Sequence, residues 1–300
     1  MISLRNGLAC LCAIGALAGV SACTSTSSAE SAPTVTVVVT DAVTTTTTAA
    51  PTTTTEAPTT TAAPTTTAAP TTTAAPTTTL PPNVEIVGRS AIQILPVGKS
   101  NGPDTVNLQN RLSQLGFWNG LPDGQYGFAT LQAVMAFQKY LGLPSTGKVD
   151  ETTAAYLTEF TEKAHGTADS GTLVEVDKRK QLLFIVIDGK TLWTFNTSTG
   201  SGIPYEATNK NDPTKVEKGD AITPNGLWKT NRERPDGWWE GDLGQIYRPK
   251  YFKGGIAIHG MTSVPNYPAS HGCVRLSTQA MDFIWDSGLV PLGTPVWVHE

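Results

Sequence analysis

The sequence predicts a multidomain protein in which a small three-helix domain precedes a mainly-β, sandwich-like domain. Three observations support this fold class. Residues 24–82 are dominated by Thr, Ala and Pro, a composition that buries too little apolar surface to fold. Apolar residues between 104 and 158 recur at helical spacing. From residue 172 onward, short β-branched and aromatic runs alternate with turn residues.

Residues 1–22 have the pattern of a secretory signal. Arg5 supplies the positive charge, and the apolar run that follows is too short to span a membrane comfortably. The run ends in Val-Ser-Ala-Cys, which resembles the lipobox of bacterial lipoproteins. We therefore expect Cys23 to be lipidated and to anchor the protein to a membrane that it does not span. The alternative is an ordinary cleaved signal followed by a chance cysteine.

Residues 23–82 form the predicted linker. Its centre repeats Ala-Ala-Pro-Thr-Thr-Thr, and no repeat carries a hydrophobic face. Pro and Thr favour extended polyproline II, which gains about 3.1 Å per residue. We expect a disordered, lipid-anchored spacer that gives the folded domains reach.

The charge of the chain is nearly balanced. It has 21 Lys and Arg residues against 25 Asp and Glu residues. No basic field indicates nucleic acid, so no nucleic-acid partner is expected.

Residues 83–165, with a core at 104–158, form the predicted helical domain. Gly116 and Gly142 are stop signals for the first two helices, and Asp150 begins the third. The apolar faces of these two helices consist of Val106, Leu108, Leu112, Leu115, Leu131, Val134, Met135, Phe137 and Leu141. Periodicity alone predicts only a small three-helix domain.

The residues of this segment also resemble a known family. In order they are similar to the peptidoglycan-binding-domain-1 pattern, on Leu108-Gln109, Leu112, Leu115-Gly116, Asp123-Gly124, Tyr126-Gly127, Thr130, Ala133-Val134, Phe137-Gln138 and Gly142-Leu143. The resemblance implies a module that binds the peptidoglycan polymer. A spacer without wall affinity is the alternative.

Residues 172–300 form the predicted β-rich domain. Strands are expected at 173–176, 182–187, 191–195, 254–259 and 294–298. Asp188-Gly189 favours a hairpin between two of them. Ser277 is a candidate N-cap for one helix that ends at Asp286.

Cys273 is singled out by elimination. The other three cysteines lie within the first 23 residues, so an exported and lipidated chain keeps one free thiol. A lone thiol in an oxidising compartment is either inert and buried or reactive.

Two histidines accompany this thiol. His259 and His271 precede Cys273 by 14 and 2 residues, and a nearby imidazole can accept the proton of a thiol. His259 can approach from a different strand, with the carbonyl of Gly260 free to orient its ring. Gly272 allows a bend that could aim the N–H groups of Gly272 and Cys273 at an oxyanion. Zinc ligation by the two histidines and the cysteine is an alternative, but the pattern supplies no fourth ligand.

This segment resembles the catalytic motif of the YkuD-type L,D-transpeptidases. The match consists of His259-Gly260 and Ser270-His-Gly-Cys-Val-Arg-Leu276. Supporting matches lie upstream at Val176-Asp177, Gln181-Leu182, Asp188-Gly189, Thr199-Gly200, Thr223-Pro-Asn-Gly226, Tyr251-Phe252 and Gly254-Gly255. The gap between His259 and Ser270 is short beside many members, which changes the expected cleft mouth but removes no catalytic residue.

The resemblance implies a role for each residue of the motif. Cys273 would be the nucleophile, His259 the general base and later acid, and Gly260 the carbonyl that orients His259. Ser270, His271 and Gly272 would shape the oxyanion site. Arg275 would steady the site or pair with a substrate carboxylate. The resemblance implies no metal or organic cofactor, and acylation by carbapenems.

The reaction implied is cross-linking of peptidoglycan stem peptides through a Cys thioester. Donor and acceptor stems are the expected partners, and cell wall biogenesis and cell shape are the expected context. The enzyme would be exported and lipid-anchored at the outer face of the cytoplasmic membrane, and would act in the cell wall. An L,D-carboxypeptidase-type hydrolase and a non-catalytic wall-binding lipoprotein are the alternatives.

One substrate contact is expected outside the motif. The region before the His259 strand is rich in aromatic residues, which more often pack than bind. Of these, only Tyr251 is predicted to contact the substrate, because it directly precedes that strand. Trp228, Trp238, Trp239 and Tyr247 are expected to pack.

Overall fold

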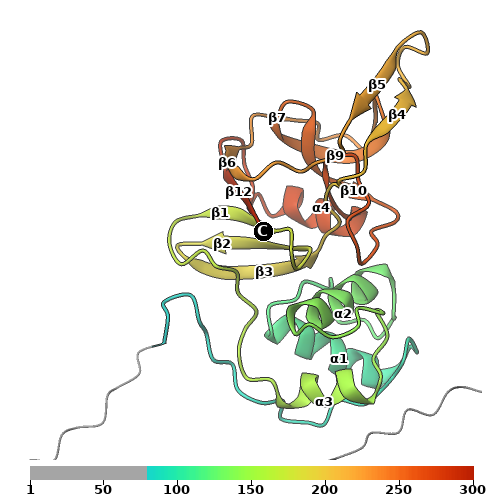
Figure 1. Ribbon diagram of the computed structural model, residues 1–300. Coiled ribbons are helices and arrows are strands. Elements are labelled where there is room, and N and C mark those ends of the chain that lie inside the picture. The colour runs from blue at the N-terminus through green and yellow to red at the C-terminus, as the bar shows by residue number, and fades with distance from the viewer. Residues whose placement is uncertain (1–79) are drawn as a thin grey trace, which may run out of the picture. The chain divides into compact units, whose positions relative to one another are not determined.

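The computed structural model describes residues 80–300 (Figure 1). The predicted signal segment, Cys23 and all but the end of the predicted linker lie outside these residues. Among the residues described, no helix is both long enough and apolar enough to cross a bilayer.

Three helices form the first part of the described chain. They are α1 (Pro103–Gln114), α2 (Phe128–Tyr140) and α3 (Glu151–Glu159), as the periodicity predicts. The carboxylate of Asp150 accepts a hydrogen bond from the Thr153 N–H at 2.8 Å and so caps α3. Their shared core is built on Leu108, Leu112, Phe117, Phe137 and Leu157, each fully buried.

The first sheet has the strand order β3-β2-β1-β12-β6. Its strands are β1 (Leu173–Asp177), β2 (Leu182–Ile187), β3 (Lys190–Asn196), β6 (Gly226–Lys229) and β12 (Pro295–His299). The predicted hairpin joins β2 to β3, and Asp188 and Gly189 at its turn have φ of 49° and 78°. Two successive positive φ values fit a type I′ turn.

The second sheet has the order β11-β10-β9-β7, and β8 pairs with β9. Its strands are β7 (Arg232–Glu233), β8 (Trp238–Gly241), β9 (Gly244–Lys253), β10 (Ile256–Met261) and β11 (Val274–Ser277). Ser277 caps α4 (Thr278–Asp286) as predicted, with its hydroxyl accepting from the Ala280 N–H. A separate hairpin pairs β4 (Tyr205–Thr208) with β5 (Val216–Gly219).

The apolar faces of the two sheets and α4 share one core. It consists of Val174, Val176, Leu183, Ile185, Phe195, Phe252, Ile258, Val274, Leu276, Ala280, Met281, Ile284, Val290, Val296 and Val298. This arrangement confirms the predicted mainly-β, sandwich-like fold beside a helical domain.

β2 is buried on both of its faces. Leu183 and Ile185 belong to the core between the sheets, whereas Leu182, Phe184 and Val186 belong to the core of the helices. Side chains alternate across a strand, so one continuous apolar run serves both cores. The three helices therefore share a core with the outer face of the first sheet, and α2 lies beside β3 (Figure 1).

Two features differ from the expected strands. The strand expected from residue 254 begins at Ile256, because Gly254 has a φ of 55° and turns the chain between β9 and β10. The strands from β4 to β9 were not predicted. Several are short, and β4, β5, β6 and β8 are largely solvated, so they lack the dense apolar runs by which the other strands were recognised.

Candidate active site

Two adjacent parallel strands, β10 and β11, bring the motif residues together. Ile258 pairs with Val274, and both point into the core. Because strand side chains alternate, His259 and its pairing partner Arg275 point to the opposite face. Cys273 directly precedes Val274, and it lines the same cleft as these two residues. The apolar residues Ile258 and Val274 thus fix both strands in the core, and the polar residues His259 and Arg275 lie on the opposite face.

The Cys273 thiol is partly exposed and is held against the start of β10. Its sulfur accepts a hydrogen bond from the Ala257 N–H at 3.4 Å and makes a weak contact with the Gly255 carbonyl at 3.8 Å. The His259 ring is not among the hydrogen-bond partners of this sulfur within residues 80–300. Catalytic hydrogen bonds are often long without substrate and shorten when it binds.

A tight turn precedes the thiol and is closed by two hydrogen bonds of the Ser270 hydroxyl. Ser270 Oγ donates to the Cys273 carbonyl at 2.6 Å and accepts from the Gly272 N–H at 3.0 Å. The Gly272 carbonyl in turn accepts from Thr223 Oγ1 at 2.7 Å. Gly272 has a φ of 127°, and a Cβ there would lie 2.9 Å from the Ile222 carbonyl oxygen. Only glycine fits this position.

This turn corrects one expected role. The Gly272 N–H was expected to point at the oxyanion, but it is already committed to Ser270 Oγ. Ser270 and Gly272 therefore fix the turn that carries the nucleophile. No hydrogen bond of the Cys273 N–H is found within the described chain, which leaves that N–H as the available donor.

His259 is buried and its ring is oriented by the next residue. Its Nδ1 lies 3.0 Å from the Gly260 carbonyl oxygen, so the hydrogen is assigned to Nδ1 and Nε2 keeps a free lone pair. The pKa of His259 is lowered to about 4, mainly by burial and also by nearby Arg275, against the opposing effect of the Gly260 carbonyl. Burial also raises the pKa of the Cys273 thiol. Both groups are thus neutral at pH 7, a thiol and a free base that line the same cleft.

Arg275 brings a partly buried positive charge into the cleft. Burial lowers its pKa, and its Nε is buried without a hydrogen-bond partner in the described chain. Arg275 also forms none of the ion pairs found there. An unpaired cation in a cleft is a binding group for a ligand carboxylate.

The backbone of Arg275 is supported by residues 196–199. Thr197 Oγ1 donates to the Arg275 carbonyl at 2.8 Å, and the Arg275 N–H donates to the Ser198 carbonyl at 3.1 Å. This segment is held from the other side by α2. Lys139 Nζ donates to the Thr197 carbonyl at 3.1 Å, and Gln132 Oε1 accepts from Asn196 Nδ2 at 2.6 Å.

The cleft around these groups has a volume of about 540 Å³. Tyr251, the predicted substrate contact, lines the cleft but is only 6 % exposed. The exposed ring of His271 packs edge-on against Tyr205 of β4, with ring centroids 4.6 Å apart.

Many further residues line the cleft and were not predicted. Among them are the charged residues Arg232, Arg234, Glu217, Glu240 and Asp242, and the aromatic residue Trp239. Trp239 was expected only to pack. No motif marks any of these residues in the sequence, because they come from short exposed strands and loops.

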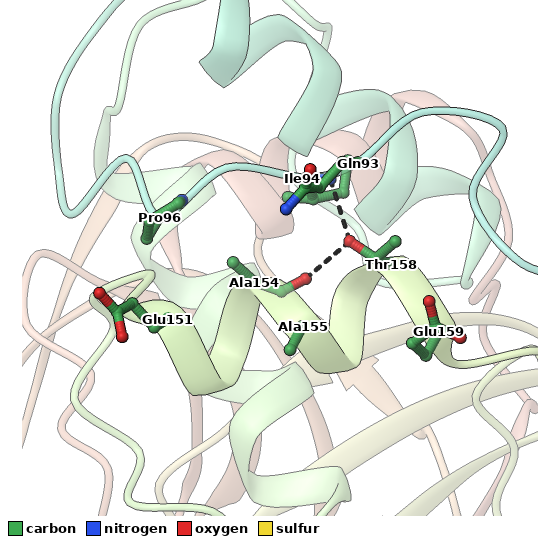
Figure 2. Close-up of a pocket in the computed structure, with 8 residues that line it drawn as sticks. All are labelled: Gln93, Ile94, Pro96, Glu151, Ala154, Ala155, Thr158 and Glu159. Carbon is green, nitrogen blue, oxygen red and sulfur yellow. Dashed lines mark hydrogen bonds between the residues drawn. The ribbon is translucent and has the colours of Figure 1, made fainter.

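A second hollow of about 500 Å³ lies on the helical part, between residues 93–96 and α3. Figure 2 shows Thr158 bridging its two sides, with Oγ1 accepting from the Ile94 N–H and donating to the Ala154 carbonyl. Its only charged lining groups are Glu151 and Glu159. Its lining contains no thiol, imidazole or cation, unlike that of the first cleft. Within residues 80–300, no group of three or more His, Cys, Asp or Glu side chains is placed to hold a metal ion.

Comparison with known families gives two matches along the chain. Residues 171–298 match YkuD, the L,D-transpeptidase catalytic domain, and residues 101–157 match PG_binding_1, a putative peptidoglycan binding domain. The crystal structure of the L,D-transpeptidase (residues 123–326) from Xylanimonas cellulosilytica is 42 % identical. That match covers 70 % of this chain and 99 % of the other, with a TM-score of 0.61.

Curated relatives are similar over shorter stretches. A spore cortex-lytic enzyme of Bacillus cereus is 36 % identical over 90 residues, which are 30 % of this chain and 33 % of the relative. An N-acetylmuramoyl-L-alanine amidase of Mycobacterium tuberculosis is 46 % identical over 46 residues, 15 % of this chain and 11 % of the relative. The chain thus spans about a third or less of the length of these curated relatives.

Proposed function

Since this chain belongs to the YkuD family of L,D-transpeptidase catalytic domains, we propose that it cross-links peptidoglycan stem peptides through a thioester on Cys273. One observation carries the proposal. Cys273, His259 and Arg275 line one cleft, while the residues between them on the same two strands anchor the opposite face in the core. The arrangement supplies a nucleophile, a base and a cation.

In the first half-reaction the Cys273 sulfur attacks the carbonyl carbon of the third residue of a donor tetrapeptide. The thiol proton passes to Nε2 of His259, which is free because Nδ1 is engaged by Gly260. The C–N bond then breaks, and His259 returns the proton to the departing D-Ala amine. The product is a thioester on the enzyme.

In the second half-reaction the amine of an acceptor stem attacks the thioester carbonyl. His259 accepts the amine proton as the new C–N bond forms, and the C–S bond breaks. The returning proton regenerates the thiol. The Cys273 N–H is the proposed donor to the oxyanion in both halves, and a donor of this kind is worth roughly 3 kcal/mol in the transition state.

Arg275 fits the carboxylate of the terminal D-Ala. That carboxylate lies one residue beyond the scissile bond, and the unpaired guanidinium lines the same cleft as the sulfur. A charge-assisted pair would orient the scissile carbonyl over Cys273.

The helical domain is proposed to hold the polymer on which the enzyme acts. This rests on the match to a putative peptidoglycan binding domain at residues 101–157. We further propose export, lipidation of Cys23 and action in the cell wall, on the N-terminal pattern. Labelling of cells with a lipid precursor, for the native chain against Cys23→Ala, tests the anchor: loss of label in the variant is expected.

Mass spectrometry tests the reaction. The full chain is incubated with a disaccharide-tetrapeptide, and cross-linked dimer is expected from the native protein but not from Cys273→Ser. Intact mass should also show an adduct on Cys273 with a carbapenem. Release of D-Ala with tripeptide product and no dimer would indicate a hydrolase instead. No product and no adduct from a folded protein would refute both.

A further inference from the structure

The cleft contains two arginines that the proposed reaction does not use. Arg232, in β7, and Arg234, just after it, line the cleft together with Cys273. Both side chains are exposed, and neither forms an ion pair with any described residue. Within residues 80–300, the only hydrogen bond that either guanidinium makes is a long one, 3.4 Å from Arg232 Nη2 to the Gly254 carbonyl oxygen.

Each guanidinium is stacked on an aromatic ring. Arg232 Cζ lies 4.0 Å from the ring centroid of Tyr251, and Arg234 Cζ lies 4.4 Å from that of Trp239. Stacking occupies the flat face of a guanidinium but leaves its N–H edge available, and it limits the side chain's conformations. The two guanidinium groups are thus held in place by stacking, while their N–H donors remain available to a ligand.

Tyr251 lies in the same cleft as this pair and the nucleophile. Burial raises the pKa of its phenol; Arg232 and Arg234 lower that pKa, whereas Cys273 and Asp242 raise it. The two guanidinia therefore share the cleft with the phenol and the sulfur. The backbone beneath is fixed as well, since the Arg234 N–H donates to the Pro249 carbonyl at 3.0 Å and the Asn231 N–H to the Tyr251 carbonyl at 2.9 Å.

We propose that Arg232 and Arg234 form a carboxylate-binding subsite that makes the cleft selective for stem peptides whose side-chain carboxyls are free rather than amidated. The inference rests on the proposed function, and it concerns carboxylates other than the terminal one assigned to Arg275. A guanidinium group with free N–H donors binds a carboxylate through two parallel hydrogen bonds. A neutral amide has only one acceptor oxygen, and its NH2 group would face the N–H donors of the guanidinium.

Binding of stem peptides to the full chain with Cys273→Ala tests the subsite without the reaction, because this variant cannot form the thioester. Two synthetic tetrapeptide stems are compared by calorimetry, one with free side-chain carboxyls and one with those carboxyls amidated. We expect the free form to bind about tenfold or more tightly. The preference should vanish when Arg232→Gln and Arg234→Gln are added. Arg179→Gln, an exposed arginine in the β1–β2 turn outside the cleft, is the matched control and should keep it.

Equal binding of the two stems, or a preference that survives the double substitution, overturns the inference. Alkylation of Cys273 by the uncharged reagent iodoacetamide should proceed at the native rate in the double variant, which shows that the fold and the nucleophile are intact. If the selective binding is observed while the native enzyme forms no thioester, the subsite stands and the proposed reaction fails. The two ideas can therefore be judged separately.

Discussion

At the scale of single residues, burial decides the protonation of the reacting pair. His259 is inside the protein and close to the positive charge of Arg275, and both effects disfavour imidazolium. Burial likewise disfavours the thiolate of Cys273. The two groups are therefore both neutral at rest, and in the proposed reaction the proton would move as the sulfur attacks rather than beforehand.

The rate of acyl transfer should depend on pH accordingly. The pKa of His259 is lowered to about 4, so the free base is present at any pH well above 4. We expect kcat/KM to stay level from about pH 5.5 to 7 and to fall as pH drops through about 4, whereas an ordinary histidine would give a fall near 6.5. A pH series with a soluble tetrapeptide measures this, and an acid limb near 6.5 would contradict it.

The free energy of unfolding should also depend on pH through the lowered pKa of His259. In the unfolded chain His259 takes up a proton near pH 6.5, and in the folded chain only near 4. Between pH 4 and 6.5 the unfolded state therefore binds more protons than the folded state. The contribution of the neutral ring to the free energy of unfolding is fully present above pH 6.5 and is lost as the pH falls towards 4. The loss amounts to about 3 kcal/mol. Denaturant unfolding at pH 7 and pH 4.5 should show a smaller difference for His259→Gln than for the native chain.

The turn at Gly272 should tolerate no side chain. A Cβ would approach the Ile222 carbonyl oxygen to 2.9 Å, at a φ of 127° that side chains rarely adopt. We expect Gly272→Ala to lower the melting temperature and to slow alkylation of Cys273 at least several-fold, because the turn that aims the sulfur must shift. Gly202→Ala, at a positive φ with no atom within 4 Å, is the control for backbone strain alone.

At the scale of elements, α2 supports the segment behind Arg275. Lys139 has no carboxylate partner in the described chain and donates to the carbonyls of Gln181 and Thr197 at 3.1 Å each. Burial lowers its pKa to about 7. Thr197 then holds the Arg275 backbone through its hydroxyl. A helix of the helical domain is thus part of the scaffold of the cleft.

Replacing Lys139 by Met should reveal this support. The variant keeps the length of the side chain but removes the donors to two buried carbonyls, which should cost about 1–3 kcal/mol of stability. If the segment at 196–199 shifts, KM for a stem with a free terminal carboxylate should rise more than KM for one with an amidated terminus, because Arg275 loses its position. An equal change for both stems would indicate a structural effect only.

At the scale of the whole described chain, the two domains depend on one strand. Leu182, Phe184 and Val186 of β2 lie in the core of the helices, and each is fully buried. Burial of a large apolar side chain is worth about 1.5–3 kcal/mol relative to exposure. Removing the helices would place three such side chains in water on the face of a sheet.

A chain truncated before residue 166 should therefore be unstable, whereas residues 80–300 should fold. We expect the shorter chain to bind a hydrophobic dye and to melt at least ten degrees lower, or to aggregate. Polar substitutions of Leu182 and Val186 in the truncated chain should restore solubility. Equal melting temperatures for the two lengths would show that the β domain is independent.

Local patterns in the sequence determined the helices, the apolar strands and the motif, but not the solvated strands between β4 and β9. Asp150 and Ser277 mark helix starts, Asp188-Gly189 marks a hairpin, and the Ser-His-Gly-Cys run marks the proposed nucleophile, because caps, turns and short motifs depend on a few neighbouring residues. The tertiary structure decided what depends on residues far apart in the chain. It committed the Gly272 N–H to Ser270, joined the helices to β2 and placed Arg232 and Arg234 in the same cleft as the sulfur. Such contacts are fixed by how sheets and helices pack, and no short stretch of sequence encodes them.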